Sequence, residues 1–295
     1  MSSESEVWTV GKLLEWTTNY LQDSGSESAR LDAEVLLASA MQCQRVALYT
    51  QFESDPGDQV RTHFRTAVKQ RSEGRPVAYM VGFKEFYSMK FAVNDSVLIP
   101  RPATEDLVIK VLDLIKAHHH TDDVLKIVDV GTGSGIIAGT LATQLQRSVL
   151  FATDLSAEAI DVALSNFQQL SVADRVTTRQ GDLLDAVSDQ GDYDFVVSNP
   201  PYVSEAEYES MQRDVKDFEP RMALVPGPSG LEIYQRLIPQ TADKLKPGGW
   251  LVLETSPMLA TELAQLITDH APITHTAHWS LVTAAHMAPQ PCVRI

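Results

Sequence analysis

The run Asn199-Pro-Pro-Tyr202 directly follows the apolar segment Tyr193–Ser198, and its residues could hold a planar amino or amide group. Its prolines fix φ twice and remove two backbone donors, so the turn is expected to be rigid. The Asn199 side-chain oxygen and the Pro200 carbonyl can each accept one N–H, and the Tyr202 ring offers a flat face. An Asn-Pro turn with a packed tyrosine is the alternative. The candidate catalytic residues are Asn199, Pro200, Pro201 and Tyr202.

A glycine-rich turn follows another apolar segment, Leu125–Val130. Such a turn at the carboxyl edge of a sheet is where open α/β folds bind ligands, and glycine lets the backbone approach a cofactor. Ile136 stands where a dinucleotide fingerprint needs its third glycine, which disfavours a nicotinamide cofactor. A tight turn without a ligand is the alternative. The turn consists of Gly131, Thr132, Gly133, Ser134 and Gly135.

Acidic side chains follow the next two predicted strands. Asp154 lies about 20 residues past the glycines, as expected for a carboxylate that binds ribose hydroxyls. Ser156 is available to cap the helix that follows, which leaves Asp154 for a ligand. Asp182 ends the third strand and could accept from an adenine amino group. A helix start for Asp154 and a turn role for Asp182 are the alternatives.

These residues need a sheet to bring them together, and the chain supplies the pattern for one. Apolar strands that alternate with amphipathic helices predict an α/β fold with a parallel sheet covered on both faces. The last two segments, Ile273–Trp279 and Pro291–Ile295, could close the sheet as an antiparallel pair. The other predicted strands are Leu125–Val130, Val149–Thr153, Val176–Gln180, Tyr193–Ser198 and Trp250–Glu254, with helices from Ile136, Ala157 and Leu231.

The chain has 295 residues, which favours two domains. Apolar residues at helical spacing from Val10 to Arg71 predict a helical bundle. Short β-prone runs after it predict a hairpin, and Thr104 is a candidate N-cap for a helix over Glu105–Lys116. We therefore expect a helical recognition domain over 1–76, a β-hairpin linker over 77–101 and the α/β domain over 102–295.

Composition narrows the range of partners. The chain has 24 Lys and Arg residues and 39 Asp and Glu residues, and its net charge of −15 disfavours a nucleic-acid substrate.

No apolar run approaches the roughly 20 residues of a membrane span, and the acidic start lacks a targeting signal, so a cytoplasmic protein is expected. Cys43 and Cys292 are too far apart for a metal motif, and His118–His120 is expected to be a solvated linker. We predict no metal site.

The glycine turn, Asp154, Asp182 and the Asn-Pro-Pro-Tyr run together resemble the S-adenosylmethionine-dependent methyltransferases of the Rossmann-like class that methylate planar nitrogens. Three further runs narrow the resemblance to the peptide chain release factor glutamine methyltransferases. It covers most of the chain in the family's order. The three runs are Arg75–Gly82, Leu98–Glu105 and Phe218–Leu224, and the shorter runs Glu85-Phe-Tyr and Ser229-Gly-Leu support them.

The resemblance implies a mostly parallel seven-stranded sheet, S-adenosylmethionine as cofactor, and methylation of the glutamine in the Gly-Gly-Gln motif of a release factor. It implies that Gly131 to Gly135 cradle the cofactor, that Asp154 holds its ribose, and that Asp182 with Leu183 borders the adenine. The remaining implied positions are Arg101 and Pro102, which would line the cofactor pocket, and Asn199 to Tyr202, which would hold the substrate amide.

Two departures from the family pattern concern the pocket's outer wall. Ala103 stands where the family has an acidic residue, and the run Glu254-Thr-Ser-Pro replaces one that contains glycine. Two related activities use the same clamp: a DNA amino-methyltransferase acting on a flipped base, and a ribosomal-protein glutamine methyltransferase. A cofactor-binding scaffold without catalysis is the alternative from another class.

Overall fold

The computed structural model of the chain describes residues 7–120, 122–270 and 278–284 and separates into two compact units. The first unit extends to Gly82 and includes Arg213–Phe218. The second consists of Phe83–Gln212 and the chain from Glu219 onward. Among the described residues, no helix combines the length and the apolar character that crossing a membrane would require.

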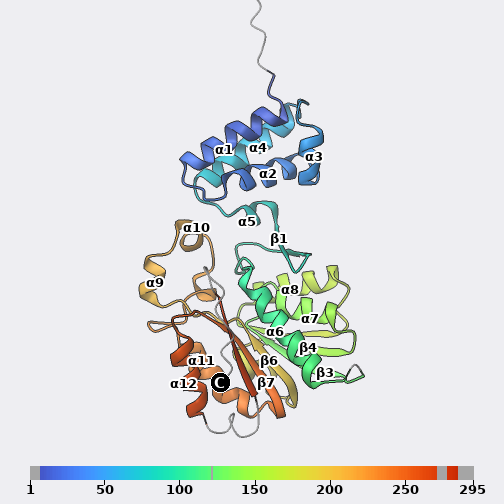
Figure 1. Cartoon of the computed structure of the whole chain (residues 1–295), viewed down its shortest axis with the longest axis vertical. Coiled ribbons are helices and arrows are strands. Elements are labelled where there is room, and N and C mark those ends of the chain that lie inside the picture. Colours follow the sequence, from blue (N-terminus) through green and yellow to red (C-terminus); the bar gives the residue numbers. More distant parts are fainter. Residues whose placement is uncertain (1–6, 121, 271–277, 285–295) are drawn as a thin grey trace, which may run out of the picture. The chain divides into compact units, whose positions relative to one another are not determined.

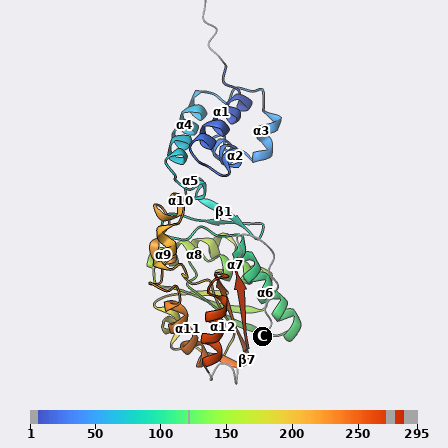
Figure 2. The same ribbon diagram turned by 60° about the vertical axis from the view of Figure 1, so that its left-hand side comes forward.

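The first unit is a helical bundle, as the periodicity predicts (Figure 2). Apolar side chains such as Leu14, Leu37, Leu48 and Phe64 are almost completely buried between its helices. The first helix begins after Thr9, whose hydroxyl accepts a hydrogen bond from the Lys12 amide. The helices are α1 (Val10–Asp23), α2 (Ala29–Ala40), α3 (Arg45–Thr50), α4 (Asp58–Ser72), α5 (Val77–Val81) and the short α10 (Arg213–Lys216).

The second unit contains a sheet of six strands in the order β5-β4-β3-β6-β7-β8, and all five pairings are parallel (Figure 1). Numbered along the sheet's own strands, this is the doubly wound order 3-2-1-4-5-6, whose switch point lies between β3 and β6. The strands are β3 (Leu125–Val130), β4 (Ser148–Asp154), β5 (Val176–Gln180), β6 (Tyr193–Ser198), β7 (Leu245–Thr255) and β8 (His278–Thr283).

Helices cover both faces of this sheet, which confirms the predicted architecture. On one face α6 (Ala103–His118), α7 (Ile136–Gln144) and α8 (Ala157–Gln169) bury side chains against β3 and β6. On the other face α11 (Glu232–Ala242), α12 (Ala260–Asp269) and the 3-10 turn η1 (Leu183–Val187) do the same. The strands are therefore apolar on both sides, as in buried parallel sheets. The remaining short elements are α9 (Glu205–Glu209) and η2 (Arg221–Ala223).

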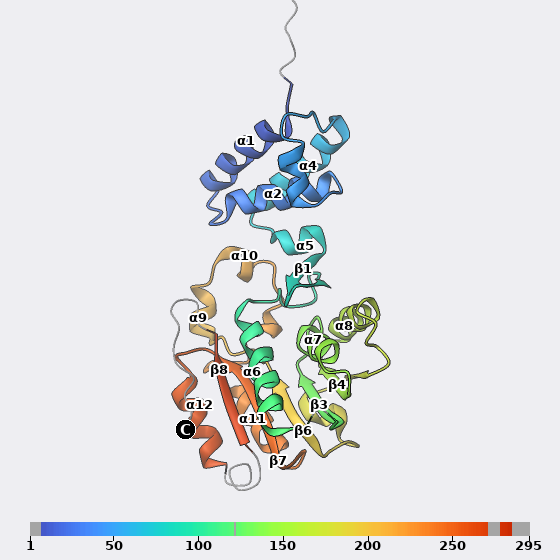
Figure 3. The same cartoon turned by 45° about the vertical axis from the view of Figure 1, so that its right-hand side comes forward.

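The predicted antiparallel pair of Ile273–Trp279 with Pro291–Ile295 lies outside the described residues, except for His278 and Trp279, which belong to β8. β8 pairs with β7 in parallel, with Trp250 beside His278 (Figure 3). The connection through α12 returns the chain to the starting edge, which a parallel crossover requires. The described part of this sheet holds six strands rather than the seven that the resemblance implies, and Pro291–Ile295 lies outside the described residues.

The predicted hairpin is shorter than 77–101. Its first β-prone residues form α5, which begins after Pro76 and ends at Gly82, where φ is +79°. A proline before a helix and a left-handed glycine after it favour this helix over a strand. The hairpin itself comprises β1 (Phe83–Phe86) and β2 (Met89–Ala92).

The prediction that Thr104 is the N-cap of the following helix is wrong. The helix α6 starts at Ala103, two residues before the predicted start at Glu105, and Pro102 holds the N-cap position without a side-chain cap. Thr104 is buried instead. Its hydroxyl is therefore available for a contact inside the unit.

Gly135, at the N-cap of α7, packs directly against Phe167 of α8. Its φ is +79°, and an added Cβ would lie 2.7 Å from the Phe167 ring. Gly248 has a similar φ of +80° but no atom within 4 Å. We expect Gly135→Ala to lower the free energy of unfolding by about 2–4 kcal/mol, and Gly248→Ala by about 1–2 kcal/mol. Urea unfolding measures both, and equal losses would contradict the packing role of Gly135.

Candidate functional site

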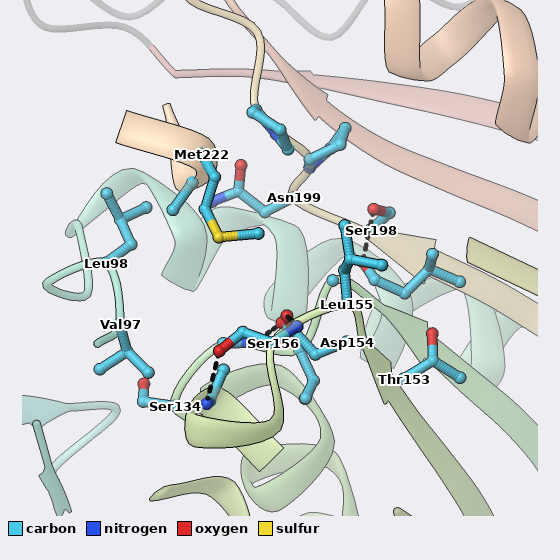
Figure 4. Close-up of a pocket in the computed structure, with 18 of the residues that line it drawn as sticks. Val97, Leu98, Ser134, Thr153, Asp154, Leu155, Ser156, Ser198, Asn199 and Met222 are labelled. Atoms are coloured by element: carbon cyan, nitrogen blue, oxygen red, sulfur yellow. Dashed lines mark hydrogen bonds between the residues drawn. The ribbon is translucent and has the colours of Figure 1, made fainter. Parts of the chain in front are cut away.

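A pocket opens at the carboxyl ends of the parallel strands, within the second unit (Figure 4). The turns after β3, β4, β5 and β6 contribute to its wall, together with the segment before α6 and the turn η2. The structure therefore brings most of the predicted site residues together at one edge of the sheet. The predicted site residues that line the pocket are Arg101, Gly131, Thr132, Gly133, Ser134, Asp154, Asp182, Leu183, Asn199, Pro200 and Pro201.

The glycine turn forms an open cradle. Gly131 and Gly133 have φ values of +71° and +55°, and a Cβ built on either would meet no atom within 4 Å. A ligand can therefore contact this backbone directly, where a side chain would stand in its way. Gly135 differs from them: it packs against Phe167 and is not a lining residue.

Asp129, the fifth residue of β3, fixes this turn through hydrogen bonds. Its buried carboxyl group accepts from the Thr132 hydroxyl at 2.7 Å and from the Ala138 amide at 3.1 Å. Burial raises the pKa of Asp129 to about 7, although both hydrogen bonds favour the charged form. The turn and the start of α7 are thus fixed to the same group.

Asp154 reaches the turn from the neighbouring strand. Its carboxylate accepts from the Gly133 amide at 2.8 Å and from the Ser156 amide at 3.0 Å. Ser156 caps α8, as predicted, by accepting from Ala159. Asp154 therefore supports the turn as well as facing the pocket, and a carboxylate has about four acceptor sites, so it keeps capacity for hydroxyl groups. Burial is the main cause that raises its pKa.

The third acidic residue, Asp182, lies in the pocket wall, and its carboxylate is paired with a cation. It forms an ion pair with Arg236 of α11, which also lines the pocket. The next residue, Leu183, has a left-handed φ of +50°, which turns the chain at the end of β5. The sequence predicted the positions of Asp182 and Leu183 but gave no signal for Arg236.

Asn199 follows β6 at the switch point of the sheet. The preceding Ser198 hydroxyl donates to the Val130 carbonyl at 2.6 Å, which links the ends of β6 and β3. The Asn199 side-chain nitrogen donates to the Thr104 hydroxyl at 3.1 Å. This bond uses the nitrogen of the carboxamide, so the oxygen is the atom left to accept from a ligand.

Tyr202 and Pro102 are not among the lining residues. The Tyr202 ring packs against the apolar cluster under α11, and its hydroxyl donates to the Glu254 carboxyl at 3.3 Å. Burial raises the pKa of Tyr202, so its phenol stays protonated. Pro102 is exposed, and Pro100 lines the pocket beside Arg101.

Glu219 is a residue of the site that sequence reasoning missed. Its buried carboxylate accepts from the Ile99 amide at 3.1 Å and pairs with Arg101 at 2.5 Å. These bonds join the segment before α6 to the segment that carries Met222, and both segments face the pocket (Figure 4). The run around Glu219 was part of the resemblance, but no pattern paired it with Arg101.

Leu155, like Arg236, is a lining residue that sequence reasoning missed. Its side chain is 57% exposed directly after Asp154, where it can pack on a bound group (Figure 4). Its position between Asp154 and the capping Ser156, just past the end of a predicted strand, is a sequence signal that could have identified it.

Two rings of the histidine run lie beside aromatic side chains of the sheet. The His118 ring lies 5.4 Å from the Trp250 ring, and the His119 ring lies 5.6 Å from the Phe195 ring. Within the described ranges, no group of three or more His, Cys, Asp or Glu side chains could hold a metal ion.

Comparisons with known proteins cover both units. The family described as PrmC N-terminal domain matches residues 12–82, and the methyltransferase small domain matches residues 110–217. A release factor glutamine methyltransferase of Rhodopirellula baltica is 46% identical over 259 residues, which is 88% of this chain and 88% of that protein. Similarly named proteins of Koribacter versatilis and Geobacter sulfurreducens are each 38% identical and cover 88% and 86% of this chain, or 91% and 86% of their own lengths.

Asp129 predicts a pH dependence of stability. Its pKa rises from 3.8 to about 7 on folding, so the folded protein binds a proton that the unfolded chain releases between these values. The wild type therefore loses stability as the pH rises through this interval, and Asp129→Asn does not share the loss. Between pH 5 and 7 we expect wild-type stability relative to Asp129→Asn to fall by about 2 kcal/mol. Urea unfolding at each pH measures this, and a flat or rising difference would contradict it.

Proposed function

The chain belongs to the release factor glutamine methyltransferase family, and from this premise we propose that it methylates the side-chain amide nitrogen of a glutamine in a peptide chain release factor. It is an S-adenosylmethionine-dependent methyltransferase. The observation that carries the proposal is the Asn199 carboxamide, which lies in the same pocket as the glycine cradle and is oriented by Thr104.

The residues present fit the cofactor. The open backbone at Gly131 and Gly133 leaves room for a group in contact with the turn, and Asp154 beside it can accept from two ribose hydroxyls. We propose that Asp182 and Leu183 border the adenine and that Leu155 packs on the nucleoside. When bound, S-adenosylmethionine supplies an activated, positively charged methyl donor.

The chain's own residues would act on the amide. An amide nitrogen is a weak nucleophile because its lone pair is delocalised into the carbonyl. We propose that the Asn199 side-chain oxygen and the Pro200 carbonyl each accept one of its N–H groups, which orients the nitrogen and stabilises the positive charge that develops there. Tyr202 anchors the end of this rigid turn through its hydroxyl. The proton can leave the nitrogen after transfer.

The helical unit has no glycine cradle, and we propose that it docks the protein substrate. The expected partner is a release factor rather than a nucleic acid, since a net charge of −15 opposes a phosphate backbone. Because release factors act in translation, we propose the cytoplasm as its location.

The direct test is incubation with labelled S-adenosylmethionine and purified release factors, followed by mass spectrometry of the product. We expect one additional methyl group on one glutamine side chain. Methylation of duplex DNA or of ribosomal proteins, with none on release factors, would contradict the proposal.

Asn199→Ala removes one acceptor for the amide. We expect kcat to fall by about 10²–10³-fold, as when one polar group of a transition-state site is lost, with the Kd for S-adenosylmethionine nearly unchanged. Methyl-transfer kinetics and calorimetry give the two values. Equal losses in both would assign Asn199 to the cofactor instead.

Asp154→Asn removes the charged acceptor for the ribose. A hydrogen bond to a charged group contributes about 1.5–3 kcal/mol, so we expect the Kd for S-adenosylmethionine to rise by about 10–100-fold. The matched control is Asp161→Asn, which makes the same change at an exposed position of α8. An unchanged affinity in Asp154→Asn, or an equal change in the control, would remove Asp154 from this role.

A further inference from the structure

A buried carboxyl group lies behind the Asn-Pro-Pro-Tyr turn. Glu254 is the penultimate residue of β7, the strand that pairs with β6 up to Ser198 and Leu253. Its side chain is 0% exposed, and it is not among the residues that line the pocket. Glu254 therefore meets the turn from the protein interior and does not touch a ligand in the pocket.

Glu254 contacts the turn and the elements beside it. One carboxyl oxygen accepts from the Tyr202 hydroxyl at 3.3 Å, and the other has no hydrogen-bond partner among the residues that the structure describes. Its backbone carbonyl accepts from the Tyr234 hydroxyl at 2.6 Å. Burial raises the pKa of Glu254 to about 7, and the nearby side chains of Thr104, Tyr202 and Asn199 oppose that rise. The same carboxyl group thus faces both polar side chains of the turn and the hydroxyl that orients Asn199.

A carboxyl group at this position is costly. The preceding residues of the strand, Leu251, Val252 and Leu253, are apolar and fully buried, and an apolar side chain at 254 could continue their packing. Burying a carboxyl group with one oxygen unpartnered costs free energy that an apolar residue would not. Packing therefore does not explain Glu254, whereas its contacts with the turn do.

We propose that Glu254 is a positioning residue for methyl transfer: with Thr104, it holds the Tyr202 ring and the Asn199 carboxamide in the arrangement that accepts a glutamine amide. This role rests on the proposed function. Glu254 acts through Tyr202 and Thr104, and it takes no proton from the substrate because it does not reach the pocket.

The test is a double-mutant cycle between Glu254 and Tyr202, read in kcat on a release factor and in the Kd for S-adenosylmethionine. A buried hydrogen bond to a charged group is worth about 10–100-fold, so we expect Glu254→Leu and Tyr202→Phe each to lower kcat by about 10-fold or more. Coupled residues lose less together than separately, so Tyr202→Phe should cost less than about 3-fold in the Glu254→Leu background. The Kd should stay unchanged throughout.

Glu254→Gln keeps the shape and one acceptor oxygen, so it should retain more kcat than Glu254→Leu. If Glu254→Leu fails to fold, the cycle is run with Glu254→Gln, where Tyr202→Phe should again cost less than in the wild type. The matched control is Asp194→Asn. Asp194 is a buried carboxylate at the opposite end of β6 that binds Lys126 and Lys246, and its loss should lower stability without changing kcat.

Fully additive losses in kcat, or a Kd that rises as kcat falls, would overturn the positioning role. A wild type that leaves release factors unmethylated would overturn the proposed function instead. In that case the same cycle is read in urea unfolding, where coupling between positions 254 and 202 would support the positioning of the turn and additive losses would reject it.

Discussion

Carboxyl groups buried at the carboxyl ends of neighbouring parallel strands are the constraint on which the site depends. Each must find donors, because an unsatisfied buried carboxyl group is strongly destabilising. The donors lie on the turns and on the first turn of α7: Thr132 and Ala138 for Asp129, and Gly133 and Ser156 for Asp154. The turns cannot move away without leaving these groups unpaired, so the sheet edge fixes the pocket before any ligand is bound.

Most of the second unit could be predicted because its signals are local. A parallel sheet covered on both faces requires continuous apolar strands, and β3, β4 and β6 lie where such runs occur. The glycine turn and the two prolines also act locally, since they set the backbone at the position they occupy. The edge of the sheet at which Asp154 and Asn199 meet follows from strand direction alone.

What the sequence could not predict are contacts between distant segments. Asn199 and Thr104 are 95 residues apart, Arg101 and Glu219 are 118 apart, and no periodicity pairs them. Thr104 shows the consequence: a threonine next to a helix start was interpreted as a cap, but in the structure its hydroxyl orients Asn199. The five residues of α5 are too few for helical spacing to be distinguished from a β-prone run.

The polarity of the turn explains how such a site can select glutamine over glutamate, which has nearly the same shape. Because the Asn199 nitrogen is bound by Thr104, its oxygen is the atom left for the substrate, and the Pro200 carbonyl is also an acceptor. Two acceptors suit the two N–H donors of a primary amide. The oxygens of an ionised carboxylate would instead face these two acceptor oxygens, and they would find no hydrogen-bond donor there. A site built for hydrogen bonding strongly rejects such a mismatched side chain. Arg101 and Arg236 line the pocket, and each is paired with a carboxylate, so they do not offer an anionic side chain an unpaired cation. With Asn199 in its proposed role, selection of a neutral amide beside a cationic donor would depend on the orientation of one carboxamide, which the hydrogen bond to Thr104 sets.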